Sequence, residues 1–174
     1  SNIQESKTSV GEGEFLTIEI AGYGHKKIEF FEGVSDSGEQ YEYKECTIIC
    51  LYVRNKSNTD WRFRGEDVAI TSKDKFSHSS PHDIINGEPS PWNNGGFGHG
   101  INRDSKARVV LFYSSNFIPE KVEYMGKLLH CHGDITAGDG RSRNKEKITI
   151  PIDDGIRANI NTIPDSLSTN DITL

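Results

Sequence analysis

The stretch from Tyr41 to Asp60 constrains the fold of this chain more than any other. It reads YEYKECTIICLYVRNKSNTD, a long run rich in β-branched and aromatic residues that stops in a cluster of Asn, Ser and Thr. Such a run predicts a β-strand over about residues 42–54, followed by a tight connection. Apolar side chains alternate onto both faces of this strand, which favours a central position in a sheet that is covered on both sides.

The same alternation predicts further strands. Leu16, Ile18 and Ile20 are separated by polar residues, which is the period-two pattern of a half-buried strand. Other stretches with strand character cover residues 27–31, 66–71, 107–114, 121–130 and 147–152. No segment keeps the apolar spacing of a helix. The sequence therefore predicts an all-β protein, an immunoglobulin-like antiparallel β-sandwich of about 7–9 strands with one long loop.

The chain is long enough for one domain with its own core. Residues 1–13 are polar and without periodicity, so we expect a flexible leader there. The sandwich is expected over residues 14–152. Within it, Gly22-Tyr23-Gly24 is interpreted as a turn between two strands. Residues 153–174 are interpreted as a last strand or a C-terminal tail.

Charge and hydropathy exclude some function classes. The formal net charge is −6 and is spread along the chain, which disfavours attraction to a phosphate backbone. Nucleic acid is therefore not an expected partner. No apolar stretch approaches the length needed to cross a bilayer. A membrane anchor that precedes residue 1 is compatible with the polar leader.

The segment from Lys73 to Asp104 is the expected long loop, because it is rich in Gly and Pro and lacks strand alternation. Loops of this length in a compact domain are often functional. Aromatic side chains dominate recognition surfaces. We therefore expect residues 77–104 to bind a partner, with Trp92, Phe97, His99 and the preceding Trp61 as candidate contact residues; the alternative is that these rings fill the core.

The positions of the three cysteines limit which disulfides can form. Cys46 and Cys50 are four residues apart on one predicted strand, so their Cα atoms are about 13 Å apart, beyond disulfide reach. Cys131 could bridge to one of them if its strand lies in the facing sheet, and Cys50–Cys131 is slightly preferred. The alternative is three buried thiols that pack as small apolar groups.

His130 and His132 form the sharpest chemical pattern, because residues i and i+2 of a strand project to the same side. Two imidazoles could bind one metal ion, with His78, His82 or His99 as a third ligand. This pattern lacks a placed carboxylate or thiolate. The Ser, His and Asp residues around position 78 show no nucleophile motif. We expect no cofactor and no catalytic residues.

Two segments resemble a known family. They are TIICLYVRNKSNTDWRFRGEDVAITSKDKF (47–76) and GINRDSKARVVLFYSSNFIPEKVEYMG (100–126). Their order of strand, turn, Pro-containing loop and strand is similar to secreted immunoglobulin-like domains of unknown function in bacterial and archaeal lipoproteins, and to the mycobacterial immunoprotective antigen. The chain departs from that pattern at residues 103–105, where the family usually has a Gly, and in a longer 77–99 insertion. The resemblance implies an extracytoplasmic, non-enzymatic domain and carries over no catalytic residues.

Three functions follow as hypotheses. The first is a cell-surface or secreted module that binds a protein or an envelope component through the 77–104 loop. The second is a metal-binding protein or metal-dependent enzyme that uses His130 and His132. The third is a structural subunit of a surface layer or filament. The expected location is extracellular or at the cell surface, with the cytoplasm as the alternative, and the sequence leaves the oligomeric state open.

Overall fold

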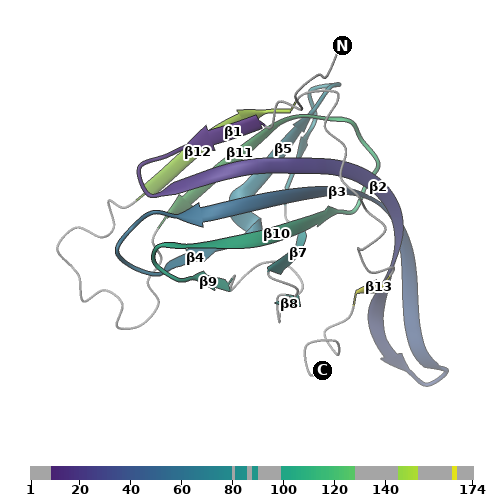
Figure 1. Ribbon diagram of the computed structural model, residues 1–174. Helices are drawn as coiled ribbons and strands as arrows, with labels where there is room; N and C mark the ends of the chain where they lie inside the picture. The colour runs from purple at the N-terminus through teal and green to yellow at the C-terminus, as the bar shows by residue number, and fades with distance from the viewer. Residues whose placement is uncertain are drawn as a thin grey trace, which may run out of the picture.

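Two antiparallel β-sheets packed face to face form the protein (Figure 1). The computed structural model describes residues 9–79, 81–85, 88–89, 99–127, 145–152 and 166–167. These residues contain thirteen strands, of which eight have four or more residues, and a single helical turn, η1 (Gly65–Asp67). The predicted all-β sandwich is confirmed.

The larger sheet has seven strands in the order β1-β2-β3-β10-β7-β8, with β13 added to β2 in parallel. Its strands are β1 (Ser9–Glu12), β2 (Leu16–Ser35), β3 (Gly38–Asn55), β7 (His82–Ile85), β8 (Glu88–Pro89), β10 (Ser105–Tyr113) and β13 (Ser166–Leu167). β3 lies between β2 and β10, so the long strand that we predicted over residues 42–54 is confirmed as a central strand.

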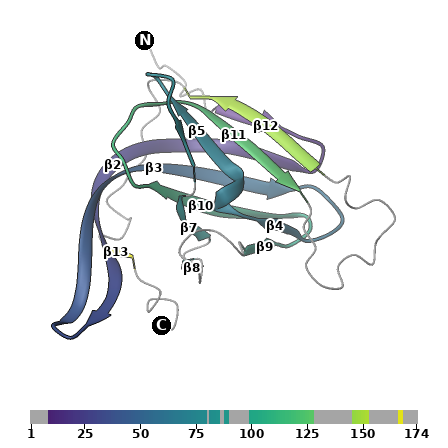
Figure 2. The same cartoon turned by 180° about the vertical axis from the view of Figure 1, so that it is seen from behind.

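The smaller sheet has four strands in the order β12-β11-β5-β6 (Figure 2). They are β5 (Val68–Ser72), β6 (Ser77–His78), β11 (Pro119–Lys127) and β12 (Lys145–Pro151). A two-stranded ribbon of β4 (Trp61–Phe63) and β9 (His99–Ile101) adds side chains to the core. The segment that we predicted as a structureless loop thus contains four short strands, β6 to β9. β6 and β8 pair with the nearby β5 and β7, whereas β7 and β9 pair with the more distant β10 and β4.

Side chains from both sheets form the main core between them. It includes Leu16, Ile18 and Tyr23 from β2, further residues of β2, β3, β4, β5, β9, β10, β11 and β12, and Phe117 and Ile152, which lie outside the strands. A second apolar cluster lies on the opposite face of the larger sheet. Its members are Ile28, Phe30, Cys46, Ile48, Cys50, Val110 and Phe112. Both faces of β3 are therefore covered, as its alternation predicted.

The Asn/Ser/Thr cluster after β3 makes the connection that the sequence indicated. Asn55 is fully buried, and its side-chain amide donates to the carbonyl oxygens of Thr59 and Ile101 at 2.8 and 2.9 Å. Its Oδ1 accepts hydrogen bonds from the backbone N–H and the hydroxyl of Ser57. These bonds replace the strand ladder and turn the chain toward β4.

The turn predicted at residues 22–24 is wrong, because β2 runs through this position. The pairing with β3 shifts by one residue between Ile20 and Gly22, which leaves Ala21 as the extra residue of a β-bulge. Gly22 has a φ of 153°, a conformation that side-chain-bearing residues rarely adopt. The sequence signal for a turn was in fact the signal for a bulge.

Two chain-end expectations also change. Ser9 to Glu12 pair with Thr17 to Ile20 as β1, so the leader that we expected over residues 1–13 is too long at its C-terminal end. In the 153–174 stretch, Ser166 and Leu167 pair with Glu29 and Phe30 of β2. The rest of that stretch lies outside the described residues.

Candidate functional site

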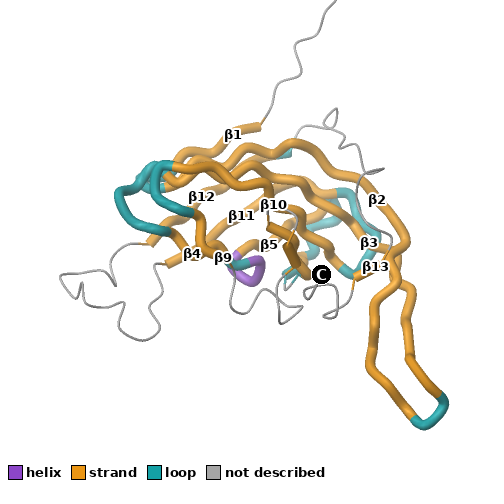
Figure 3. The backbone as a smooth tube through the Cα atoms, turned by 60° about the horizontal axis from the view of Figure 1, so that its bottom comes forward, coloured by secondary structure: helices purple, strands orange, loops and turns teal. Residues whose placement is uncertain are grey.

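The two sheets differ greatly in length, and this difference creates a projecting hairpin. β2 and β3 have 20 and 18 residues, whereas β5, β11 and β12 have 5, 9 and 7. At about 3.4 Å per residue the long strands extend far beyond the facing sheet. Residues 26–45 of β2 and β3, called the arm below, therefore leave the sandwich as a ribbon, with β13 paired to Glu29 and Phe30 of β2 (Figure 3).

One face of the arm continues the core face of the larger sheet. The bulge at Ala21 moves the core-facing positions of β2 from Ile20 to Tyr23, and His25 then pairs with Thr47. The same alternation places the following pairs on this side: Lys27 with Glu45, Glu29 with Tyr43, and Phe31 with Tyr41. A second register shift, between Phe31 and Gly33, then places Val34 with Glu39 on this side as well. These eight residues are called the arm face.

The loop after β10 marks where the covered core ends. The hydroxyl of Thr47 donates to the carbonyl oxygen of Ser115 at 2.7 Å and accepts from the backbone N–H of Phe117 at 3.0 Å. His25 Nε2 lies 2.7 Å from the carbonyl oxygen of Phe117. The Phe117 ring stacks on His78 with 3.7 Å between centroids. This cluster closes the core, and the arm face begins beyond it.

Apolar and aromatic side chains are exposed on the arm face. The exposed fractions are 74% for Val34, 46% for Tyr41 and 60% for Tyr43. The Phe31 ring packs against Tyr41 with centroids 5.5 Å apart. Three large apolar side chains on one side of a short ribbon form a patch of the kind that marks interaction surfaces.

Carboxylates lie beside both tyrosines. The Tyr41 hydroxyl donates to Glu39 at 2.6 Å. A hydrogen bond to Glu29, together with the charge of this carboxylate, raises the pKa of Tyr43 above its ordinary value. The Lys27 ammonium lies 5.2 Å from the centroid of the Tyr43 ring. The arm face thus combines rings that accept a cation with carboxylates next to them.

The opposite side of the arm is anchored to the larger sheet. The rings of Phe30 and His82 are 4.6 Å apart, although two strands, β3 and β10, separate β2 from β7. Across a flat sheet this separation would be about 14 Å. The sheet therefore curls around its second apolar cluster, and His82 holds the base of the arm. Burial, with a smaller effect of Lys44, lowers the pKa of His82 from 6.5 to about 4.

This histidine predicts a pH dependence of stability. The folded protein keeps His82 neutral down to about pH 4, whereas the unfolded chain binds the proton near pH 6.5. The contribution is therefore fully present above pH 6.5 and is lost as the pH falls toward 4. We expect wild type to lose about 2–3 kcal/mol more than His82→Phe over this range, measured by urea unfolding at several pH values. Equal losses in the two proteins would contradict a buried neutral His82.

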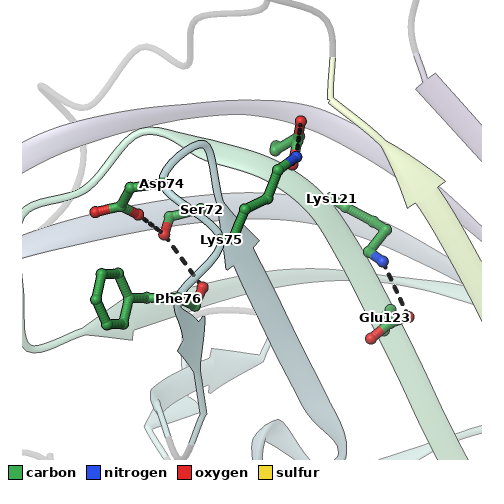
Figure 4. A network of polar contacts seen from close by, with 7 residues as sticks. Ser72, Asp74, Lys75, Phe76, Lys121 and Glu123 are labelled. Atoms are coloured by element: carbon green, nitrogen blue, oxygen red, sulfur yellow. Dashed lines mark hydrogen bonds and ion pairs between the residues drawn. The ribbon is translucent and has the colours of Figure 1, made fainter.

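The Ser, His and Asp residues of the 72–83 stretch do not form a catalytic triad in the described residues. The hydroxyl of Ser115 lies 3.3 Å from His78 Nδ1, and His78 Nε2 is buried without a hydrogen-bond partner. Asp74 accepts instead from the hydroxyl of Ser72, which lowers the pKa of Asp74 (Figure 4). A base needs a second group that orients it, and His78 has none there.

The same turn is tied to the smaller sheet. Lys75 has a φ of 71° and reaches Glu120, with its Nζ 2.6 Å from Oε2, while Lys121 pairs with Glu123 along β11 (Figure 4). The Lys75–Glu120 ion pair links the turn between β5 and β6 to β11, whereas the Lys121–Glu123 pair lies within β11.

The predicted contact residues have different outcomes. Trp61 is 1% exposed and belongs to the main core, so its assignment to a binding surface is wrong; β4 turns the ring inward, where its N–H meets a buried hydroxyl. His99 begins β9, and its backbone pairs with Phe63. Trp92 and Phe97 lie outside the described residues, so their role stays a prediction.

The predicted metal and disulfide sites cannot be placed. His130, His132 and Cys131 lie outside the described residues. In the described part of the chain, no group of three His, Cys, Asp or Glu residues could hold a metal ion. Cys46 and Cys50 are buried and free there, and burial raises the pKa of Cys46 to about 11. Both thiols pack in the second apolar cluster.

Sequence reasoning missed the arm face. The signal that could have found it is the continued alternation of Tyr41 and Tyr43 with charged residues at the start of β3. The alternation along β3 places Tyr43 on the same face as the core residues Ile49 and Leu51. The missing information was the length of the facing sheet.

No family model matches the sequence, and no curated protein matches it. One solved structure that is similar in fold is a candidate lipoprotein, ycdA, from Bacillus subtilis subsp. subtilis strain 168. It is 16% identical, with a TM-score of 0.49, and the match covers 87% of this chain and 41% of that chain. This chain thus spans less than half of that protein.

A second solved structure is a functionally unknown protein from Listeria monocytogenes EGD-e. It is 12% identical with a TM-score of 0.45, and the match covers 87% of this chain and 88% of the other. Similarity at this level leaves the function to be argued from the residues of this chain. No helix in the described residues is long and apolar enough to span a membrane.

Proposed function

We propose that this protein is a non-enzymatic binding module that acts outside the cytoplasm and recognises a protein or an envelope component. The observation that supports binding is the arm face, where Val34, Tyr41 and Tyr43 are exposed together on a ribbon that leaves the sandwich. Aromatic side chains supply much of the binding energy at protein interfaces. The extracytoplasmic location is part of the proposal and comes from the sequence resemblance to secreted domains.

The 77–104 segment is a second part of the proposed surface. Its strand β7 pairs with β10, and His82 on β7 contacts Phe30 at the base of the arm. The segment therefore contacts the arm at His82, on the side opposite the arm face. A deletion of residues 81–98 would remove β7 from the larger sheet, so a useful truncation is limited to residues 90–98, which contain Trp92 and Phe97.

Binding to isolated cell envelopes tests the proposal. The arm variant is Val34→Thr/Tyr41→Thr/Tyr43→Thr, because threonine keeps the strand preference while it removes the apolar surface. The matched control is Phe76→Thr/Ile118→Thr/Met125→Thr, which removes three side chains that are 66%, 51% and 60% exposed elsewhere on the protein.

We expect wild type and the control to bind envelopes with the same affinity and the arm variant to bind at least about tenfold more weakly. Thermal unfolding of both variants should stay close to wild type, since all six side chains are exposed. The proposal is overturned if labelled wild type binds isolated envelopes no more tightly than it binds a cytosolic protein fraction. Equal binding by the arm variant and the control removes the arm as the site.

A further inference from the structure

We propose that the arm face binds an extended, basic polypeptide segment of a partner, with Lys or Arg at alternate positions. This inference rests on the proposed function and names the class of partner. Four features of the arm support it: the rings accept cations, carboxylates flank them, the arm is acidic, and the repeat along β3 matches an extended chain.

The rings of the arm already bind the chain's own ammonium groups. Lys27 lies 5.2 Å from the centroid of Tyr43 on the arm face, and Lys44 lies 5.3 Å from the centroid of Phe30 on the opposite side. Tyr43 and Tyr41 are still 60% and 46% exposed. A partner's Lys or Arg stem can therefore lie on either ring and gain a cation–π contact together with apolar burial.

Each tyrosine on the arm face has a carboxylate next to its hydroxyl. Glu39 accepts from Tyr41 at 2.6 Å, and Glu29 accepts from Tyr43. An ammonium or guanidinium group that crosses the ring meets this carboxylate at the ring edge, where it forms a charge-assisted hydrogen bond. The two contacts favour the same cationic side chain, and a carboxylate in its place would be repelled.

The charge of the arm selects the partner. Residues 26–45 contain three lysines and six acidic residues, a net charge of −3 in a chain of net charge −6. Half of the net charge thus lies in about a ninth of the sequence. Docking of a second copy, arm face to arm face, would bring like charges together, whereas a basic segment is attracted at long range.

The repeat along the arm indicates an extended partner. Tyr41 and Tyr43 are two residues apart on β3 and project to the same side, so their Cα atoms are about 6.8 Å apart. In an extended partner chain, side chains that project to the same side are separated by this same distance. Basic side chains at positions i and i+2 of the partner therefore match the two rings in order.

Two synthetic peptides of about nine residues test the inference by fluorescence anisotropy, one with alternating Lys and Thr and one with alternating Glu and Thr. We expect wild type to bind the Lys peptide at least about tenfold more tightly than the Glu peptide, and binding to weaken strongly between about 50 and 300 mM salt. Tyr41→Thr/Tyr43→Thr and Glu29→Gln/Glu39→Gln should each raise Kd about tenfold.

The charge control is Glu66→Gln/Asp104→Asn, which makes the same change in net charge away from the arm. Asp104 has a φ of 54°, a conformation that asparagine accepts. This control should keep the wild-type Kd within about twofold. The inference is overturned if wild type binds neither peptide or binds both equally, or if the control weakens binding as much as Glu29→Gln/Glu39→Gln.

Sedimentation of wild type at several concentrations tests the remaining alternative, in which a second copy of the chain occupies the arm face. Concentration-dependent dimers that disappear in Tyr41→Thr/Tyr43→Thr would show that a second copy occupies the arm face, and would also overturn the inference. Whether or not dimers form, the envelope-binding experiment tests the proposed function independently of the basic partner. Envelope binding that depends on the arm, with no preference for the Lys peptide, leaves the proposed function intact and removes only the basic partner.

Discussion

Replacing Trp61 with alanine is expected to lower the free energy of unfolding by about 3–5 kcal/mol. The ring is 1% exposed and stacks on Phe15 with centroids 5.6 Å apart. Its Nε1 donates to the Tyr124 hydroxyl at 2.8 Å, so the truncation leaves both a cavity and a buried hydroxyl without its donor. Urea unfolding followed by far-ultraviolet circular dichroism measures the loss, because this signal comes mainly from the backbone and does not require tryptophan fluorescence.

Two further variants separate the causes of this loss. Trp61→Phe keeps an aromatic ring but removes the N–H donor, and we expect an intermediate loss of about 1–3 kcal/mol. Phe76→Ala removes a ring that is 66% exposed, and the free energy of unfolding should change by less than about 0.5 kcal/mol. Stability of Trp61→Ala within the range of Phe76→Ala would refute the position of this ring in the core.

Replacing Glu146 with alanine is expected to have an effect of similar size, about 3–5 kcal/mol. The side chain is 4% exposed, and its two carboxylate oxygens accept three backbone N–H groups, from Glu14 at 3.0 Å, Phe15 at 3.0 Å and Leu16 at 2.7 Å. The carboxylate joins β12 of the smaller sheet to the start of β2. A side chain at Gly13 would collide with it.

Denaturant unfolding again provides the measurement, now with Glu146→Gln and Glu123→Ala for comparison. Glutamine keeps one oxygen acceptor but turns an amide donor toward the backbone donors, so we expect about half of the alanine effect. Glu123 is partly exposed and forms an ion pair with Lys121 at 3.5 Å, and its removal should cost less than about 1 kcal/mol. A loss for Glu146→Ala no larger than that for Glu123→Ala would show that these hydrogen bonds contribute little.

Much of the fold could be predicted because period-two alternation reports burial directly. The central strand β3 was predicted from residues 42–54, and its residues from Cys46 to Leu51 are buried on both faces. The strand predicted over residues 147–152 begins two residues after the start of β12 at Lys145, and it therefore left out Glu146. Glu146 shares the inward parity of Ile148 and Ile150, and this was the available signal.

The remaining features depend on residues that are distant in the sequence. The short strands β7 and β9 exist because β10 and β4 offer partners, which no local pattern reveals. Predicting the arm face requires a comparison of the lengths of the two sheets, because Tyr43 continues the pattern of the core residues beyond the point where the core ends. Trp61 and the exposed Tyr41 have similar local contexts, and only the facing sheet decides which ring is buried.

The extra residue at Ala21 also controls what the protein presents to its surroundings. Because it switches the inward positions of β2 from even to odd numbers, the rest of the strand inherits that choice up to the next register shift, after Phe31. If the same sequence paired with β3 without this bulge, the later residues of β2 up to that shift would change sides, with Phe30 on the core side and Phe31 on the opposite side. The bulge, more than the identity of any one exposed side chain, therefore decides which residues of β2 the arm presents.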